Sequence, residues 1–187
     1  MMEIHLDKKN LQIADRLLSG ALANVRAASS AAINRTLPHA RKKLVEKAQE
    51  RYVVKSESLK GSIRTLRSGA GSMTGMVKSS GHPLPLSYFQ TRYPKTKRAS
   101  ARVLKQGGFK PVKGLFMMEY IVNEKAKRYA FHRRQPARKP LAIPAGPSAP
   151  QMVGYDKGVS AILPDVEDYL NQRFLHEVAY RFKGFGG

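Results

Sequence analysis

The stretch SESLKGSIRTLRS, residues 56–68, decides the fold class, because its pattern changes from helical to extended within a few residues. We expect a short turn of helix that passes into a strand, with Ile63 and Leu66 as the apolar residues. Residues before this stretch have the apolar spacing of helices, whereas Gly, Pro and Ser punctuate the residues after it. The sequence therefore predicts an α+β fold, in which N-terminal helices precede a small twisted antiparallel β-sheet.

Two helices are expected on the N-terminal side, within a helical region that spans residues 7–60. From Asp7, which can cap the first helix, apolar residues recur at spacings of three and four: Leu11, Ala14, Leu18, Leu22, Val25, Ala28 and Ala32. The second helix is predicted from about Thr36 to Tyr52, with Thr36 as its cap and Pro38 in its first turn. Its basic residues are mixed with Glu46 and Glu50, so we expect this helix to pack rather than to read bases.

Residues 61–134 are predicted to form a basic β region. Short β-like runs occur at SMTGMVKSS (72–80), LSYFQ (86–90), ASARVLK (99–105), GLFMMEYIV (114–122) and RYAFHRR (128–134). The last two runs flank NEKAK, so we expect them to form a hairpin with a loop of about five residues.

An extended Pro-rich arm and a C-terminal helix complete the fold, which we expect to be a single domain over residues 1–187. The arm, residues 135–150, holds five prolines in 16 residues, so it should be extended and pack against other segments or a neighbouring subunit. The helix is predicted over residues 162–183, with Pro164 near its start, carboxylates in its first turns (Asp165, Glu167, Asp168) and an apolar stripe (Val166, Leu170, Phe174, Val178). The two terminal helices are expected to carry most of the apolar packing.

The charge is strongly positive and unevenly placed. The 187 residues include 34 Lys and Arg against 13 Asp and Glu, a formal net charge of +21. Residues 60–118 hold 12 of the basic residues and no acidic residue, so this segment needs an anionic partner or a neighbouring subunit. Its densest part, TRYPKTKRASARVLK (91–105), provides the candidate contact residues Arg92, Lys95, Lys97, Arg98, Arg102 and Lys105. They could track a phosphate backbone, dock on an acidic subunit or simply be solvated, and the sequence leaves these alternatives open.

Other kinds of chemistry have no support in the sequence. No cysteine is present, and the five histidines have no metal-like spacing among themselves or with the sparse carboxylates. Nucleotide-binding motifs, metalloprotease motifs and catalytic carboxylate pairs are also missing. We therefore expect no enzyme activity, no cofactor and no metal. No apolar run reaches the roughly 18 residues of a membrane span, so we expect a chain that is soluble and cytoplasmic when it is made.

The order of these features resembles the minor tail protein Z family of tailed bacteriophages and prophages, over residues 10–182. The local matches are AINR (32–35), with the basic helix that follows it, and the LKGSI turn (59–63). The resemblance implies a virion structural protein that completes the tail at its head-proximal end, the neck. It also implies a homo-oligomeric ring, often a hexamer, through which DNA passes, and contacts with other tail and head–tail connector proteins. It brings no catalytic residues.

Two other functions are compatible with the sequence. A non-specific DNA- or RNA-binding protein would use the basic segment, and would bind free duplex tightly at physiological salt. A morphogenesis chaperone would assist assembly and be absent from the finished particle. A tail subunit, in contrast, is expected to form defined rings or to stay bound to the tail.

Overall fold

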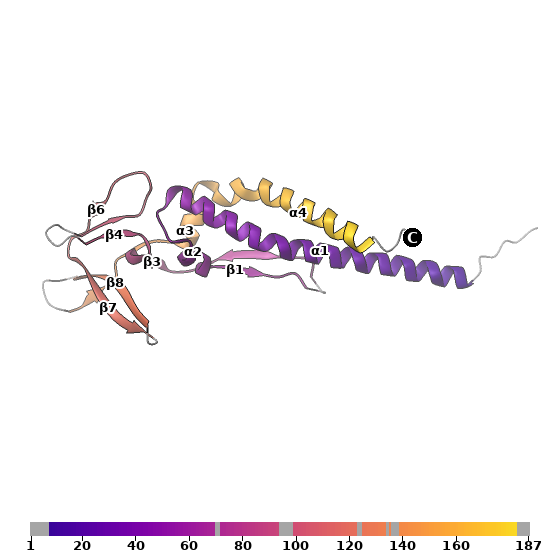
Figure 1. Ribbon diagram of the computed structural model, residues 1–187, viewed down its shortest axis with the longest axis horizontal. Coiled ribbons are helices and arrows are strands. Elements are labelled where there is room, and N and C mark those ends of the chain that lie inside the picture. Colours follow the sequence, from indigo (N-terminus) through magenta and orange to yellow (C-terminus); the bar gives the residue numbers. More distant parts are fainter. Residues whose placement is uncertain are drawn as a thin grey trace, which may run out of the picture. The chain divides into compact units, whose positions relative to one another are not determined.

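The computed structural model describes residues 8–69, 72–93, 99–122, 125–133, 135 and 139–182. The chain packs as two compact units. Unit 1 comprises Met1–Ala40, Thr65–Met76 and Pro164–Gly187, and unit 2 comprises Arg41–Arg64 and Val77–Leu163. Helices and small antiparallel sheets occur in both halves of the chain, which confirms the α+β class (Figure 1).

A single helix, α1 (Lys8–Arg51), replaces the two predicted N-terminal helices. The predicted break near Thr36 is wrong because Thr36 does not act as an N-cap. Its hydroxyl donates a hydrogen bond to the carbonyl of Ala32, one turn earlier in the helix, at 2.8 Å. Pro38 lies inside the helix, where a proline typically costs about 3 kcal/mol. Leu37 and Ala40, on either side of it, are buried. Their burial offsets the free-energy cost of the proline, so the helix stays continuous.

The turn from helix to strand lies where the sequence predicts it. The helix α2 spans Ser56–Ser62 and the strand β1 follows directly at Ile63–Leu66, so the interpretation of residues 56–68 is confirmed. Leu59 and Ile63 are 0% and 1% exposed, and they anchor the two sides of the turn in the core. β1 pairs with β2 (Met76–Ser79).

The β region consists of several small sheets, because its strands are short and Gly- and Pro-rich connections interrupt their pairing. β3 (Pro83–Pro85) pairs with β10 (Ala145–Ser148), and two three-stranded sheets have the orders β4-β5-β6 and β7-β8-β9. The bounds of these six strands are β4 Gln90–Arg92, β5 Ser100–Arg102, β6 Lys110–Pro111, β7 Leu115–Val122, β8 Lys125–Arg133 and β9 Leu141–Ala142. The run LSYFQ, predicted as a strand, begins instead as a 3-10 turn, η1 (Leu86–Tyr88).

The predicted hairpin and the Pro-rich arm are both present. Val122 of β7 pairs with Lys125 of β8, so the hairpin connection is shorter than the predicted loop. The arm is extended over β9 and β10, since β9 is an edge strand on β8 and β10 pairs with β3, whereas its last two predicted residues, Ala149 and Pro150, are helical. Ser148 at the end of β10 then caps the helix α3 (Ala149–Gly154) in a capping box with Gln151.

The helix α4 spans Gly158–Phe182, and it begins earlier than predicted because the 3-10 turn η2 (Tyr155–Lys157) leads directly into it. Pro164 therefore lies inside the helix, and the first turn contains no acidic residue. Asp165 is therefore not in the first turn, where a carboxylate would interact favourably with the helix dipole. Its carboxylate accepts a hydrogen bond from Nε2 of His39 at 2.8 Å, and the His39 ring stacks on Tyr169 with centroids 4.1 Å apart.

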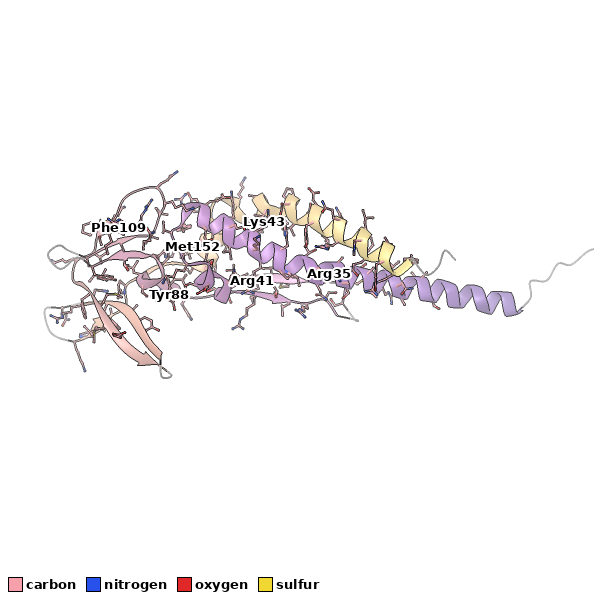
Figure 2. The ribbon with its side chains drawn as sticks, in the orientation of Figure 1. Arg35, Arg41, Lys43, Tyr88, Phe109 and Met152 are labelled. Carbon is pink, nitrogen blue, oxygen red and sulfur yellow. The ribbon has the colours of Figure 1, made fainter. Side chains whose placement is uncertain are left out.

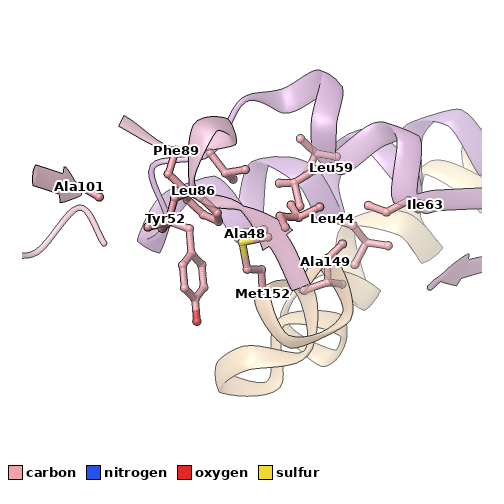
Figure 3. Close-up of a cluster of buried hydrophobic side chains, with 14 residues drawn as sticks. Leu44, Ala48, Tyr52, Leu59, Ile63, Leu86, Phe89, Ala101, Ala149 and Met152 are labelled. Carbon is pink, nitrogen blue, oxygen red and sulfur yellow. The ribbon is translucent and has the colours of Figure 1, made fainter. Parts of the chain in front are cut away.

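The main hydrophobic core lies in unit 2 (Figure 3). It joins side chains from the last turns of α1, from α2, from the β3–η1 segment and from α3. Representative members are Leu44, Leu59, Leu86, Phe89 and Met152. Burial of each large apolar side chain of this kind contributes about 1.5–3 kcal/mol, so this cluster holds unit 2 together.

The prediction that the terminal helices carry most of the apolar packing is wrong. Leu22 and Val25 of α1 are 61% and 38% exposed, and Phe174 on the predicted α4 stripe is only partly buried. Leu18 lies outside the described side chains. Polar contacts join α1 to α4 within unit 1, including an ion pair of 3.0 Å between Arg35 and the buried Glu177 (Figure 2).

Candidate nucleic-acid interface

The β4-β5-β6 sheet of unit 2 carries the described part of the predicted contact segment. Gln90 pairs with Arg102, and Arg92 pairs with Ser100. Residues two apart on a strand share a face, so Arg92 and Arg102 lie on the same face of neighbouring strands. Diagonal neighbours of this kind are about 7–8 Å apart. The sheet therefore brings two of the predicted contact residues together.

Arg92 is exposed, and an aromatic ring supports its side chain. Its guanidinium carbon lies 3.9 Å from the ring centroid of Phe109, which precedes β6 and is labelled in Figure 2. An exposed cation–π contact is worth about 0.5–1 kcal/mol. The Arg92 side chain is exposed beside this ring, so its N–H groups can reach an anion from solvent. Holding the long side chain in place also lowers the entropy cost of binding.

Arg102 has a more local role than the sequence suggests. Its Nε donates a hydrogen bond to the carbonyl of Leu104 at 3.3 Å, and a terminal nitrogen donates to the carbonyl of Lys105. The backbone N–H of Lys105 in turn donates to the carbonyl of Arg51 at 2.7 Å. Arg102 therefore stabilises the chain that leaves β5, and its charge remains on the sheet. The side chain of Lys105 is exposed.

The remaining predicted contact residues, Lys95, Lys97 and Arg98, lie outside the described residues. The structure adds two exposed lysines to the sheet that sequence reasoning did not select. Lys110 is in the edge strand β6, paired with Ala101 of β5, so it lies on the face of the sheet opposite to that of Arg92 and Arg102. Lys113 lies in the turn after β6. They belong to the same acid-free segment, 60–118, so its charge pattern could have identified them. We call the five described side chains, Arg92, Arg102, Lys105, Lys110 and Lys113, the basic sheet residues.

The basic sheet residues form no ion pair within the part of the chain that the structure describes. The ion pairs that are described involve α1 and α4, for example Lys47 with Glu50 at 2.7 Å. Uncompensated positive charge attracts polyanions, and phosphate contacts of this kind carry no base information. Strands of two or three residues are also too short to lie along a groove as a reading element. The sheet is suited to non-specific contact with a phosphate backbone.

The described residues include no group of three or more His, Cys, Asp or Glu side chains that could hold a metal ion. None of the helices in the described ranges is both long enough and apolar enough to cross a membrane. Comparison of the chain with models of protein families, with curated protein sequences and with solved structures finds no match.

Proposed function

We propose that this chain is a structural subunit of a tailed-bacteriophage virion, a minor tail or tail-completion protein at the head-proximal end of the tail. Copies form a homo-oligomeric ring, a hexamer on the pattern that the resemblance implies. The ring contacts other tail and head–tail connector proteins and surrounds the passing DNA. The chain is made in the cytoplasm of the bacterial host and resides in the neck of the particle.

The observation that carries this proposal is the group of basic sheet residues without counterions. DNA that passes through a ring has to slide, so the ring must attract phosphates without fixing the register of the bases. Four of the five side chains, Arg92, Lys105, Lys110 and Lys113, are exposed, and acidic residues are missing from the whole of 60–118. This arrangement supplies charge without base-reading geometry.

Exposed apolar side chains in unit 1 also support a subunit role. Leu22 and Met73, 61% and 55% exposed, line one groove, and Leu175 on α4 is 67% exposed. Single exposed apolar residues are normal, but two that line a shared groove are typical of an interaction surface.

Two measurements test the proposal. Mass spectrometry and immunogold labelling of purified particles, from the phage or prophage that encodes the chain, should place it at the head-proximal end of the tail. Native mass spectrometry and negative-stain microscopy of the recombinant protein should show closed rings. A chain that is absent from particles would indicate an assembly chaperone. Monomers that bind duplex tightly at physiological salt would favour the alternative, a non-specific DNA- or RNA-binding protein.

A further inference from the structure

We propose that neighbouring copies of this chain join by inserting Leu175 of α4 from one copy into the groove beside α1 of the next copy. The inference deepens the proposed ring and rests on it, because it names the two surfaces that would hold the ring together. Both surfaces belong to unit 1, and they are different parts of it. Contact between different surfaces is heterologous, and a heterologous contact closes into a ring when its rotation allows.

The groove lies along α1 and against the segment that follows β1. Its volume is about 740 Å³, and its lining is mainly apolar. Ala23, Ala27 and Ala31 line it at spacings of four, so they form one row on the helix surface. Leu22 and Met73 stand at the same groove and are exposed. A row of alanines lets the backbone of another helix approach closely and leaves space for one large side chain.

The outer face of α4 offers such a side chain. Leu175 is 67% exposed. Asp168 lies seven residues earlier, which is nearly two helical turns, so it shares the face of Leu175 at a distance of about 10 Å along the axis. Asp168 and the adjacent Glu167 are both exposed. This face therefore combines one protruding apolar side chain with carboxylates at a defined distance from it.

Charge complementarity selects α4 as the occupant of the groove. Each copy has a formal charge of +21, so copies repel one another unless acidic and basic surfaces meet. Arg26 lines the groove, and no described acidic side chain does. With the two helices running in the same direction and Leu175 seated at Ala31, Arg26 lies about 7.5 Å before that point on the axis. An arginine side chain spans the remaining few ångströms to Asp168. Pairing α1 with α1 would instead bring together two surfaces that both carry Arg26 and no described acidic side chain.

Site-specific crosslinking of the full chain tests the contact directly, because the natural sequence has no cysteine. Ala31→Cys and Leu175→Cys are made in separate proteins that differ in tag mass, mixed, and treated with a short bismaleimide. The expected product is a dimer that contains one copy of each variant. The matched control replaces Leu175→Cys with Leu66→Cys, which is 57% exposed, does not line the groove and should give no such dimer.

Each outcome is decisive. Dimers of Ala31→Cys with itself alone would indicate an α1–α1 contact and overturn the inference. Rings that form in native mass spectrometry without the mixed crosslink would overturn it and leave the proposed function standing. Protein that stays monomeric over the whole concentration range tested would contradict both the inferred contact and the proposed ring.

A charge swap gives a second readout that does not depend on reagent geometry. Arg26→Asp should raise the Kd of association about two- to fivefold, the usual range for one exposed ion pair. Adding Asp168→Arg to the same chain should restore the wild-type Kd. A double variant as weak as the single one, or weaker, would show that the two side chains do not meet.

Discussion

Removing two lysines from the basic sheet, as Lys110→Gln with Lys113→Gln, should weaken duplex binding and flatten its dependence on salt. Both side chains are exposed, and neither forms an ion pair within the described residues. Lys110 pairs with Ala101 through backbone groups only, so the substitution leaves the ladder between β5 and β6 intact. The variant therefore changes charge and little else.

The magnitude follows from the number of exposed basic side chains on the sheet. Arg92, Lys105, Lys110 and Lys113 are exposed. If each neutralises one phosphate, the logarithm of the binding constant falls against the logarithm of salt concentration with a slope of about −3.6. These four contacts alone then account for a loss of roughly 150-fold in affinity between about 50 and 200 mM salt. The double variant keeps two of these four contacts, so its slope should be shallower by about 1.8, and the two remaining contacts account for a loss of roughly 12-fold over the same range.

Fluorescence anisotropy with two labelled duplexes of unrelated sequence measures these slopes. The matched control is Lys42→Gln with Lys60→Gln, which removes the same charge from the exposed surfaces of α1 and α2. This control should lower the slope much less than the sheet variant does. Equal slopes for the control and the sheet variant would show that total charge, and not this sheet, binds the duplex. A strong preference for one duplex would contradict the sliding contact.

Three stability predictions test the fold. Leu59→Ala should lower the free energy of unfolding, measured with urea, by about 2–5 kcal/mol, because Leu59 is 0% exposed. Leu175→Ala should change the same free energy by less than about 0.5 kcal/mol. Similar changes for the two variants would contradict the position of the core. Asn34→Ala removes two hydrogen bonds with the backbone of Ser68, of 3.0 and 2.9 Å, so amide exchange over residues 65–69 should become faster; unchanged exchange would show that these bonds do not hold the segment. Ser148→Ala should cost about 1 kcal/mol by removing the N-cap of α3, and Ser148→Thr should cost less; equal losses would argue against the capping role.

The parts of the fold that the sequence predicts well depend on local interactions. In LKGSI, the transition from α2 to β1 occurs within adjacent residues, and the apolar side chains Leu59 and Ile63 mark both sides of it. The hairpin of β7 and β8 is equally local, since its strands pair through one short connection. Short-range propensity and hydrophobic pattern are sufficient to identify such elements.

The parts of the fold that the sequence predicts poorly depend on contacts between distant segments. Pro38 costs about 3 kcal/mol locally, and only the burial of its neighbours, which tertiary contacts decide, keeps α1 in one piece. The shared face of Arg92 and Arg102 depends on the register of β4 and β5, and composition does not specify a register. The local role of Arg102, which bonds to two carbonyls, likewise has no signature in a run of basic residues.

In the ring that we propose, the division of charge within the chain favours an apolar contact between neighbouring copies. Described acidic side chains lie on the helices, apart from Glu119 on β7, and the β4-β5-β6 sheet has none. Repulsion between the basic sheets of neighbouring copies is relieved when DNA neutralises them, so DNA and ring closure favour each other by the same coupling free energy. The proposed ring, however, would have to persist before DNA enters and after it leaves. An ion pair such as Arg26 with Asp168 is weakened by salt and cannot supply that attraction alone. Burial of Leu175 in the alanine-lined groove, the contact that we propose, is not screened by salt as an ion pair is, and it would hold the ring together when the passage is empty.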